Sequence, residues 1–303
     1  MKSKNLWLYY ALITTITWGF WGAFTEIPSK HGFPGSLTYV VWAISMILPA
    51  VIAIRNIGWK IDFRARSVFY GLVIGFLGAG GQLALFIGAL NQGPAYLVFP
   101  IISLSPVVTI ILSIFLLGEK ASKRGWAGII LAVFSIPLLS YSDPANSSTT
   151  GIMWLIYALL VFAAWGFQAY YMKLANQSML SEDIFFYMAL TAILLIPFSL
   201  MFTDFSANIN YGIDGPYLAF TIQILNSVGA LFLVYAFRYG KAIIVSPLTN
   251  AVAPVITIVL SLILYKSIPH VIIVAGMILA LISIFLLAFE GETTENLENK
   301  TNK

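Results

Sequence analysis

The stretch from residue 67 to residue 118 constrains this chain more than any other feature, because it contains no charged residue. It is 52 residues long, and about 20 apolar residues suffice for one α-helix to cross a bilayer. Seven further uncharged stretches cover 6–25, 31–54, 125–142, 184–203, 215–237, 242–265 and 267–289. Only 9% of the 303 residues are charged, whereas soluble proteins average about 25%. The sequence therefore predicts a polytopic integral membrane protein and excludes soluble enzymes, nucleic-acid-binding proteins and disulfide-rich secreted domains.

Turn-forming residues divide these stretches into separate helices. The longest stretch is interrupted by the polar segment 91–94, which ends in a proline, and another polar loop begins at Asp143. The expected fold class is all-α, with ten transmembrane helices. Their expected ranges are 6–27, 34–54, 67–90, 94–117, 124–141, 151–173, 183–203, 215–237, 241–265 and 269–289.

The positions of the Lys and Arg residues orient these ten helices. Alternate loops and the two termini hold 14 of the 16 cationic side chains, and only Lys30 and Lys266 fall on the other side. The 14 are Lys2, Lys4, Arg55, Lys60, Arg64, Arg66, Lys120, Lys123, Arg124, Lys173, Arg238, Lys241, Lys300 and Lys303. Because Lys- and Arg-rich short loops resist translocation, we expect both termini in the cytoplasm.

The chain contains an internal repeat. Residues 7–20 and 154–167 are identical at 8 of 14 positions, and both segments end in Trp-Gly-Phe. A second match joins 106–113 to 254–261, at 6 of 8 positions. The offset is 147 residues in the first match and 148 in the second. The same five-helix unit is therefore present twice.

Five is an odd number, so the second unit should be inverted relative to the first. Inverted repeats are typical of transporters that expose a central site to each side of the membrane in turn. We expect the first repeat at 1–142 and the second at 151–289, followed by a polar, disordered cytoplasmic tail at 290–303. Because one chain carries both repeats, we expect a monomer in the lipid bilayer.

Three sequence patterns carry a resemblance to a known family. They are Trp-Gly-Phe in the first helix of each repeat, F-P-I-I-S-L-S-P-V-V-T-I-I-L-S at 99–113, and G-E-K-A-S-K-R-G-W-A-G at 118–128. These patterns, the length and the duplication resemble the EamA-type permeases of the drug/metabolite transporter superfamily. The resemblance implies transport of a small organic metabolite, with export favoured. The second repeat departs from the pattern, because Lys266-Ser267 stands where the first has Gly118-Glu119.

Prolines fall at the middle of the fourth and ninth expected helices. Pro106 and Pro254 lie near the bilayer centre, and Pro100 and Pro247 precede them. A proline removes one backbone donor and frees a carbonyl, which hydrocarbon cannot satisfy. We therefore expect helix kinks at these four prolines, beside a polar cavity; a purely structural kink is the alternative.

Polar and tryptophan side chains at similar depth complete the expected substrate site. An amide inside a membrane helix needs a partner, so these side chains should face inward. Hydrogen bonding between helices is an alternative role for each amide. The expected site residues are Trp18, Trp21, Gln82, Ser103, Ser105, Trp165, Gln168, Asn226, Thr249 and Asn250. We expect helices 1, 3, 4, 6, 8 and 9 to line the cavity, with helices 5 and 10 outside it.

The expected lining is polar but uncharged. Proton-coupled multidrug members of the superfamily that this chain resembles carry a carboxylate deep in the first helix, where this chain has Thr14, Thr15 and Thr17. Glu26, near the outer end, is expected to be an interfacial anchor, with an outer-gate or proton-binding residue as the alternative. A neutral or zwitterionic solute, such as an amino acid, a nucleobase or a sugar-like molecule, fits such a lining.

Other function classes have less support. A flippase for a lipid-linked sugar stays open as an alternative, and an intramembrane enzyme would need mid-depth catalytic groups that the expected helices lack. We expect no catalytic residue, no metal site and no cofactor. The expected partners are a small-molecule substrate and the lipid bilayer, without nucleic acid, and the expected location is the bacterial cytoplasmic membrane.

Overall fold

The computed structural model describes residues 6–117, 122–139, 141, 151–239, 242–265 and 269–301. Throughout this part of the chain the structure is helical and contains no strand. The loop at 143–150, the Gly118-Glu119 pair and its counterpart Lys266-Ser267 lie outside the described residues, as do Lys2, Lys4 and Lys303. What the sequence predicts for them has no structural counterpart here.

The first repeat contains nine α-helices and one π-helix within the described residues. They are α1 (Leu6–Phe24), α2 (Ile27–Lys30), α3 (Gly35–Ser45), α4 (Ile47–Asn56), α5 (Ala65–Ala84), η2 (Leu85–Ala89), α6 (Leu90–Gln92), α7 (Ala95–Ile102), α8 (Pro106–Leu117) and α9 (Lys123–Leu139). Several of these join end to end into longer rods, as α3 does with α4. The rods fall on the ranges that the sequence predicts.

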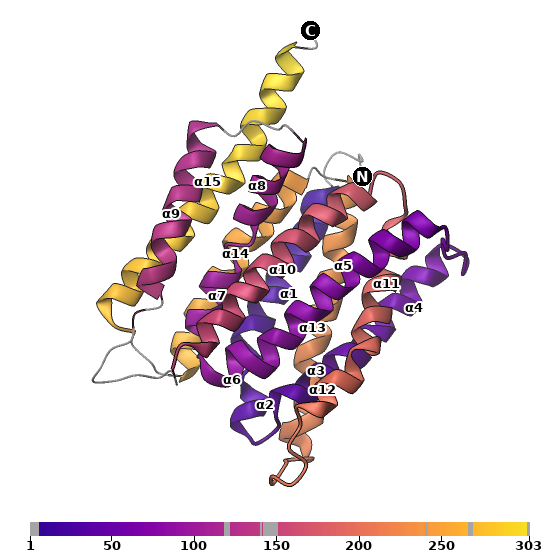
Figure 1. Ribbon diagram of the computed structural model, residues 1–303, viewed down its shortest axis with the longest axis vertical. Helices are drawn as coiled ribbons and strands as arrows, with labels where there is room; N and C mark the ends of the chain where they lie inside the picture. The colour runs from indigo at the N-terminus through magenta and orange to yellow at the C-terminus, as the bar shows by residue number, and fades with distance from the viewer. Residues whose placement is uncertain are drawn as a thin grey trace.

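The second repeat follows the same plan. Its elements are α10 (Met153–Ala175), α11 (Ser181–Leu194), α12 (Ile196–Met201), η3 (Ile213–Tyr217), α13 (Leu218–Tyr239), α14 (Ala242–Tyr265) and α15 (Val271–Thr301). The sequence predicts a disordered tail from residue 290, whereas the backbone of α15 continues as a helix to Thr301 and projects from the bundle (Figure 1). Glu, Lys and Leu favour helix and extend one that is already nucleated.

Prolines explain where the rods are interrupted. A proline inside a helix cannot bond the carbonyl four residues earlier and clashes with it. Pro49 follows the break between α3 and α4, and Pro197 follows the break between α11 and α12. These two prolines are 148 residues apart, so the two repeats break at equivalent places. Pro106 likewise begins α8 after the turn at 103–105.

The ninth expected helix behaves differently from the fourth. The fourth is divided into α7 and α8, whereas α14 runs without interruption from Ala242 to Tyr265, through Pro247 and Pro254. Pro100 also lies inside a continuous helix, α7. Of the four expected kinks, only the one at Pro106 is therefore accompanied by a break in the helix.

The helices of the two repeats pack against one another. α1 packs against α13 and α14 of the second repeat, and α10 packs against α5 and α8 of the first. α9 and α15 pack against each other along one side of the bundle (Figure 1), and α15 also packs against α14. Large buried side chains such as Tyr39, Phe185 and Met46 fill the interior.

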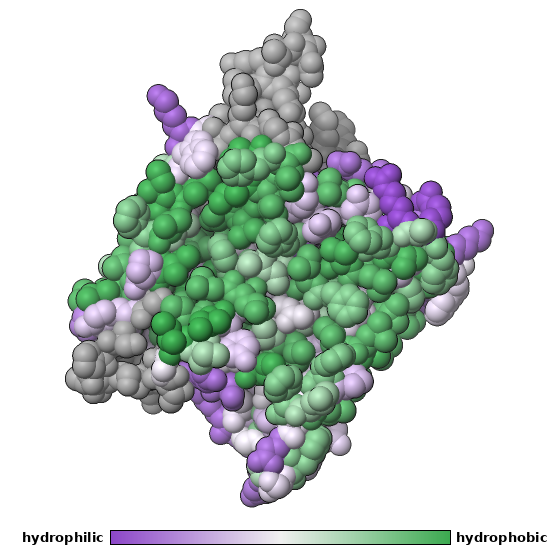
Figure 2. Space-filling view, viewed as in Figure 1, coloured by the Kyte–Doolittle hydropathy of each residue, from purple (hydrophilic) through white to green (hydrophobic). Residues whose placement is uncertain are grey.

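The outer surface has the polarity of a membrane protein. Figure 2 shows a broad hydrophobic band across the middle of the visible face, with hydrophilic side chains toward its upper right and its lower end. Large apolar side chains such as Phe115, Phe134 and Phe198 are exposed. Contact of such an apolar surface with the hydrocarbon of a bilayer is favourable, whereas its contact with water is not.

Among the described residues, six helical segments are long and apolar enough to cross a membrane. They are Gly35–Asn56, Ala65–Gln92, Ala95–Leu116, Met153–Ala175, Ser181–Met201 and Ile213–Tyr239, and Ala253–Leu264 and Val271–Leu286 are shorter apolar helices. α1 carries three Thr and five Trp or Tyr residues, and α9 has only 17 residues. The architecture is therefore that of a helical membrane protein.

Candidate functional site: a central cavity

A cavity between the two repeats encloses about 790 Å³ of space, including the space at its mouth. It lies among helices α1, α3, α5, α10, α11, α13 and α14, and none of the described residues that line it belongs to α9 or α15. Its lining comprises Trp18, Trp21, Trp42, Met46, Gly75, Gly78, Ala79, Gln82, Ser105, Trp165, Gln168, Ala169, Met172, Met188, Asn226, Ala230, Leu233, Phe237, Thr249 and Asn250.

The structure brings together nine of the ten side chains expected at the substrate site. Trp18, Trp21, Gln82, Ser105, Trp165, Gln168, Asn226, Thr249 and Asn250 all line this cavity. Ser103 does not line it, although it is buried in the turn between α7 and α8. Whether any of the nine binds a substrate stays a prediction.

Trp18 and Trp165 occupy equivalent places on opposite sides of the cavity. The Trp18 Nε1–H donates to the backbone carbonyl of Asn226 at 3.2 Å. The Trp165 Nε1–H donates to the carbonyl of Gly78 at 3.4 Å. Gly78 and Asn226 are 148 residues apart, so each repeat holds the tryptophan of the other in the same way.

Glycines make this close approach possible. A Cβ on Gly229 would lie 2.6 Å from Trp18 Nε1, and a Cβ on Gly81 would lie 2.5 Å from Trp165 Nε1. Both separations are shorter than atoms tolerate. The two glycines are again 148 residues apart, so the small residues in α5 and α13 seat the two indoles.

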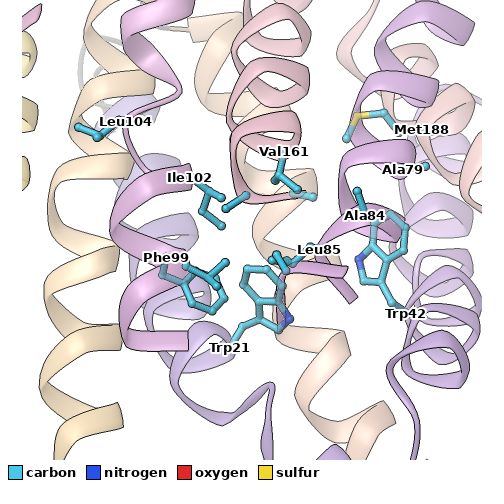
Figure 3. Close-up of a cluster of buried hydrophobic side chains, with 14 of the residues drawn as sticks. Trp21, Trp42, Ala79, Ala84, Leu85, Phe99, Ile102, Leu104, Val161 and Met188 are labelled. Atoms are coloured by element: carbon cyan, nitrogen blue, oxygen red, sulfur yellow. The ribbon is translucent and has the colours of Figure 1, made fainter. Parts of the chain in front are cut away.

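A buried hydrogen-bonded layer closes the cavity at one end of the bundle. The Trp21 Nε1–H donates to Gln223 Oε1 at 2.9 Å, and Gln223 Nε2 donates to the Thr25 hydroxyl at 3.2 Å. All three side chains are buried, and Trp21 also packs edge-on against Phe99 at 5.4 Å between ring centroids (Figure 3). Trp21, Thr25 and Gln223 are called the latch below.

The latch lies at the end of the bundle where α1 ends, called the far end below. Beside it, Glu26 accepts a hydrogen bond from the backbone N–H of Ala95 and pairs with Lys30 at 3.1 Å. These contacts join α1 and α2 to the start of α7. These contacts are compatible with the expected role of Glu26 as an anchor, which stays a prediction.

The opposite end lacks the counterpart of the latch. The repeat equivalents of Trp21, Thr25 and Gln223 are Gln168, Met172 and Gly75, and all three line the cavity. Glycine and methionine cannot reproduce the hydrogen bonds that Gln223 and Thr25 form. This end is called the basic end, because Arg55, Lys60, Arg64 and Arg66 follow or precede helices there. The lining reaches toward it along α10 and α13, as far as Met172 and Phe237.

Polar contacts at the basic end join the two repeats. The Asp62 backbone N–H donates to Asp183 Oδ1 at 3.0 Å, and the Tyr187 hydroxyl donates to the Asp62 carbonyl at 2.8 Å. Arg64 pairs with the Asp62 carboxylate at 2.6 Å. Hydrogen bonds from Arg64 and Ser67 hold the pKa of Asp62 well below its usual range.

Sequence reasoning missed the contribution of the second and seventh expected helices. Trp42 and Met46 on this second helix and Met188 in α11 line the cavity. Trp42 lies near the middle of the expected helix 34–54, so the mid-depth rule that selected Trp18 would have found it. No polar signal marks Met46 or Met188, since methionine is also common in apolar cores.

A match to a protein-family model identifies the family of this chain. The EamA-like transporter family matches the chain twice, over residues 5–141 and 152–289. The chain belongs to this family and is a transporter or permease of the drug/metabolite transporter superfamily, an integral membrane protein.

Two further comparisons add no activity. The chain is 35% identical over 78 residues to the uncharacterized protein MJ1333.1 of Methanocaldococcus jannaschii. That match covers 26% of this chain and 56% of the relative, so the chain spans only about half of the relative's length in the match. A solved crystal structure of a protein is similar with a TM-score of 0.64 at 18% identity, covering 93% of this chain and 95% of the other.

Proposed function

We propose that the chain is a secondary transporter that moves a small neutral or zwitterionic organic solute by alternating access. The supporting observation is the reciprocal seating of Trp18 and Trp165 on opposite repeats, around a cavity that the latch bounds at one end. A site between two equivalent units can open to either side when the units exchange conformations.

The proposed topology is ten membrane spans arranged as two inverted five-helix repeats, with both termini in the cytoplasm. The beginning of α1 and the end of α15 lie at the same end of the bundle, which supports an even number of spans (Figure 1). The cation distribution supports a cytoplasmic basic end, in a bacterial cytoplasmic membrane.

We propose that the described conformation faces the cytoplasm. The cavity reaches toward the basic end, whereas the latch closes the far end. A transporter that waits in this state accepts its solute from the cytoplasm, which favours export. Transport rather than catalysis is the activity that the family membership supports.

The cavity lining supports an uncharged or internally compensated solute. None of the described lining residues is Asp, Glu, Lys, Arg or His. An ion with net charge would lose its hydration there without gaining a counter-charge. The amides of Gln82, Gln168 and Asn226 are suited to orient polar groups by hydrogen bonding.

Single-cysteine labelling tests alternating access directly. The chain contains no cysteine, so Ala230→Cys would place one thiol in the cavity. We expect a membrane-impermeant maleimide to label it rapidly from the basic side and slowly from the far side. Ala207→Cys, in an exposed far-end loop, is the control and should react from the far side only. Labelling of Ala230→Cys from one side alone under all conditions would contradict alternating access.

A further inference from the structure

Two buried N–H groups in the cavity lack an acceptor. Trp42 is 5% exposed and Gln82 is 3% exposed, and both side chains line the cavity. Trp42 Nε1 and Gln82 Nε2 have no hydrogen-bond partner among the described residues. Figure 3 shows the Trp42 indole near Ala79 and Ala84 on α5. Gln82 lies between these two alanines in the chain, so Trp42 lies alongside the part of α5 that holds Gln82.

Trp42 differs in this respect from the other tryptophans of the cavity. The indoles of Trp18, Trp21 and Trp165 all donate to an oxygen atom of the protein. An indole N–H can only donate, so reorienting the ring cannot turn it into an acceptor. A buried donor without an acceptor has a free-energy cost that an incoming acceptor would remove. Such a group in a cavity therefore points to a ligand.

The rest of the lining narrows the chemistry of that ligand. Four tryptophans, Phe237 and three methionines offer flat or adaptable apolar surfaces, and no charged residue is among the described lining residues. Aromatic rings stack well against such surfaces. The transfer of an uncharged ring system from water into this cavity would therefore be favourable.

We propose that Trp42 and Gln82 together hold a carbonyl-type oxygen of an uncharged solute that has a flat aromatic or heterocyclic body. This assignment rests on the proposed transport function and narrows its substrate class. The two N–H groups donate to the oxygen, and the tryptophans enclose the ring. A solute that lacks the oxygen leaves both donors unpaired and binds more weakly.

Binding of two matched probes to the purified full-length protein in nanodiscs tests this assignment. Indole-3-carboxamide has the flat ring and the carbonyl oxygen, whereas 3-methylindole has the ring alone. We expect wild-type protein to bind the amide at least about 10-fold more tightly, because a site built to donate to a polar group rejects an analogue that lacks it. With ¹⁵N-labelled tryptophan, the Trp42 indole N–H resonance should shift downfield with the amide only.

Three variants separate the donors from general packing. Trp42→Phe keeps an aromatic ring and Gln82→Met keeps a side chain of similar length, but both remove the N–H groups, and each should reduce the preference for the amide several-fold. Trp154→Phe is the matched control, because Trp154 is buried away from the cavity lining, and it should keep the wild-type preference. Thermal unfolding of each variant confirms folding.

Equal binding of the two probes by wild-type protein, binding of neither probe, or an unchanged preference in both donor variants would overturn the assignment. The cysteine-labelling test of alternating access uses no ligand. Its outcome therefore stays separate, and a failure of the donor pair can be distinguished from a failure of the transport function.

Discussion

Thr257 donates its hydroxyl proton to the backbone carbonyl of Gly19 across 3.1 Å. The repeat equivalents form the same bond, since the Thr109 hydroxyl donates to the carbonyl of Gly166 at 2.9 Å. Each bond joins a proline-containing helix of one repeat to the Trp-Gly-Phe helix of the other. The two repeats are thus connected by a reciprocal pair of buried hydrogen bonds beside the cavity.

Removing these hydroxyl groups should destabilise the protein modestly and equally. Thr257→Val and Thr109→Val leave the glycine carbonyls without this donor, and each should lower the free energy of unfolding by about 0.5–1.5 kcal/mol. Thr221→Val is the control, because the exposed Thr221 hydroxyl bonds only within its own helix. Thermal unfolding in detergent measures all three. Threonine variants as stable as wild type would show that the bonds do not hold the repeats together.

Replacing a glycine at a helix–helix contact by alanine should destabilise the protein. A Cβ on Gly166 would overlap Val108 and the Ser105 carbonyl, whereas a Cβ on Gly80 meets nothing within 4 Å. We expect Gly166→Ala to destabilise the protein by about 1–3 kcal/mol through overpacking. Gly80→Ala should be neutral or slightly stabilising, because alanine favours helix. Equal effects of the two changes on the unfolding temperature would contradict the packing argument.

The latch should control access from the far end. Gln223→Met removes the acceptor for Trp21 and the donor to Thr25, two hydrogen bonds worth about 0.5–1.5 kcal/mol each. We expect far-side labelling of Ala230→Cys to rise about 5- to 150-fold, because the closed state loses its stabilisation. Gln177→Met, at an exposed position, is the matched control. An unchanged far-side rate would exclude a gating role for the latch.

The cation distribution makes a prediction about topology. Reporter fusions at residues 1 and 303 should both be cytoplasmic, and an epitope inserted in 143–150 should be accessible from outside intact cells. The reason is that Lys- and Arg-rich loops stay in the cytoplasm. An external C-terminus would contradict the ten-span topology.

The Asp62 contacts predict a pH dependence at the basic end. The pKa of Asp62 is lowered in the folded protein by hydrogen bonds from Arg64 and Ser67. Its stabilising contribution is therefore complete above the unfolded pKa of about 3.9 and is lost as the pH falls through the lower, folded pKa. We expect Asp62→Asn to lower the unfolding temperature at pH 6, with the difference shrinking below about pH 4. A difference that grows on acidification would contradict this sign.

The sequence alone was sufficient for the protein class, the repeat and most of the tryptophan and polar residues of the cavity. Uncharged stretches predict membrane helices because hydrocarbon does not solvate charge, and a proline such as Pro106 predicts a break because it lacks a backbone donor. Nine of the ten expected site side chains meet in one cavity, since a polar group such as Gln82 in an apolar helix must face inward.

Only the tertiary structure decided which inward-facing groups have partners and which end of the cavity is closed. Gln223 and Gln82 have the same side-chain chemistry at similar depth, yet Gln223 completes the latch and Gln82 keeps an unpaired N–H. Likewise, Trp18 donates to Asn226 while Trp42 has no acceptor. These differences depend on contacts between residues far apart in the chain, and helix periodicity specifies a face of a helix but not the atom that meets it.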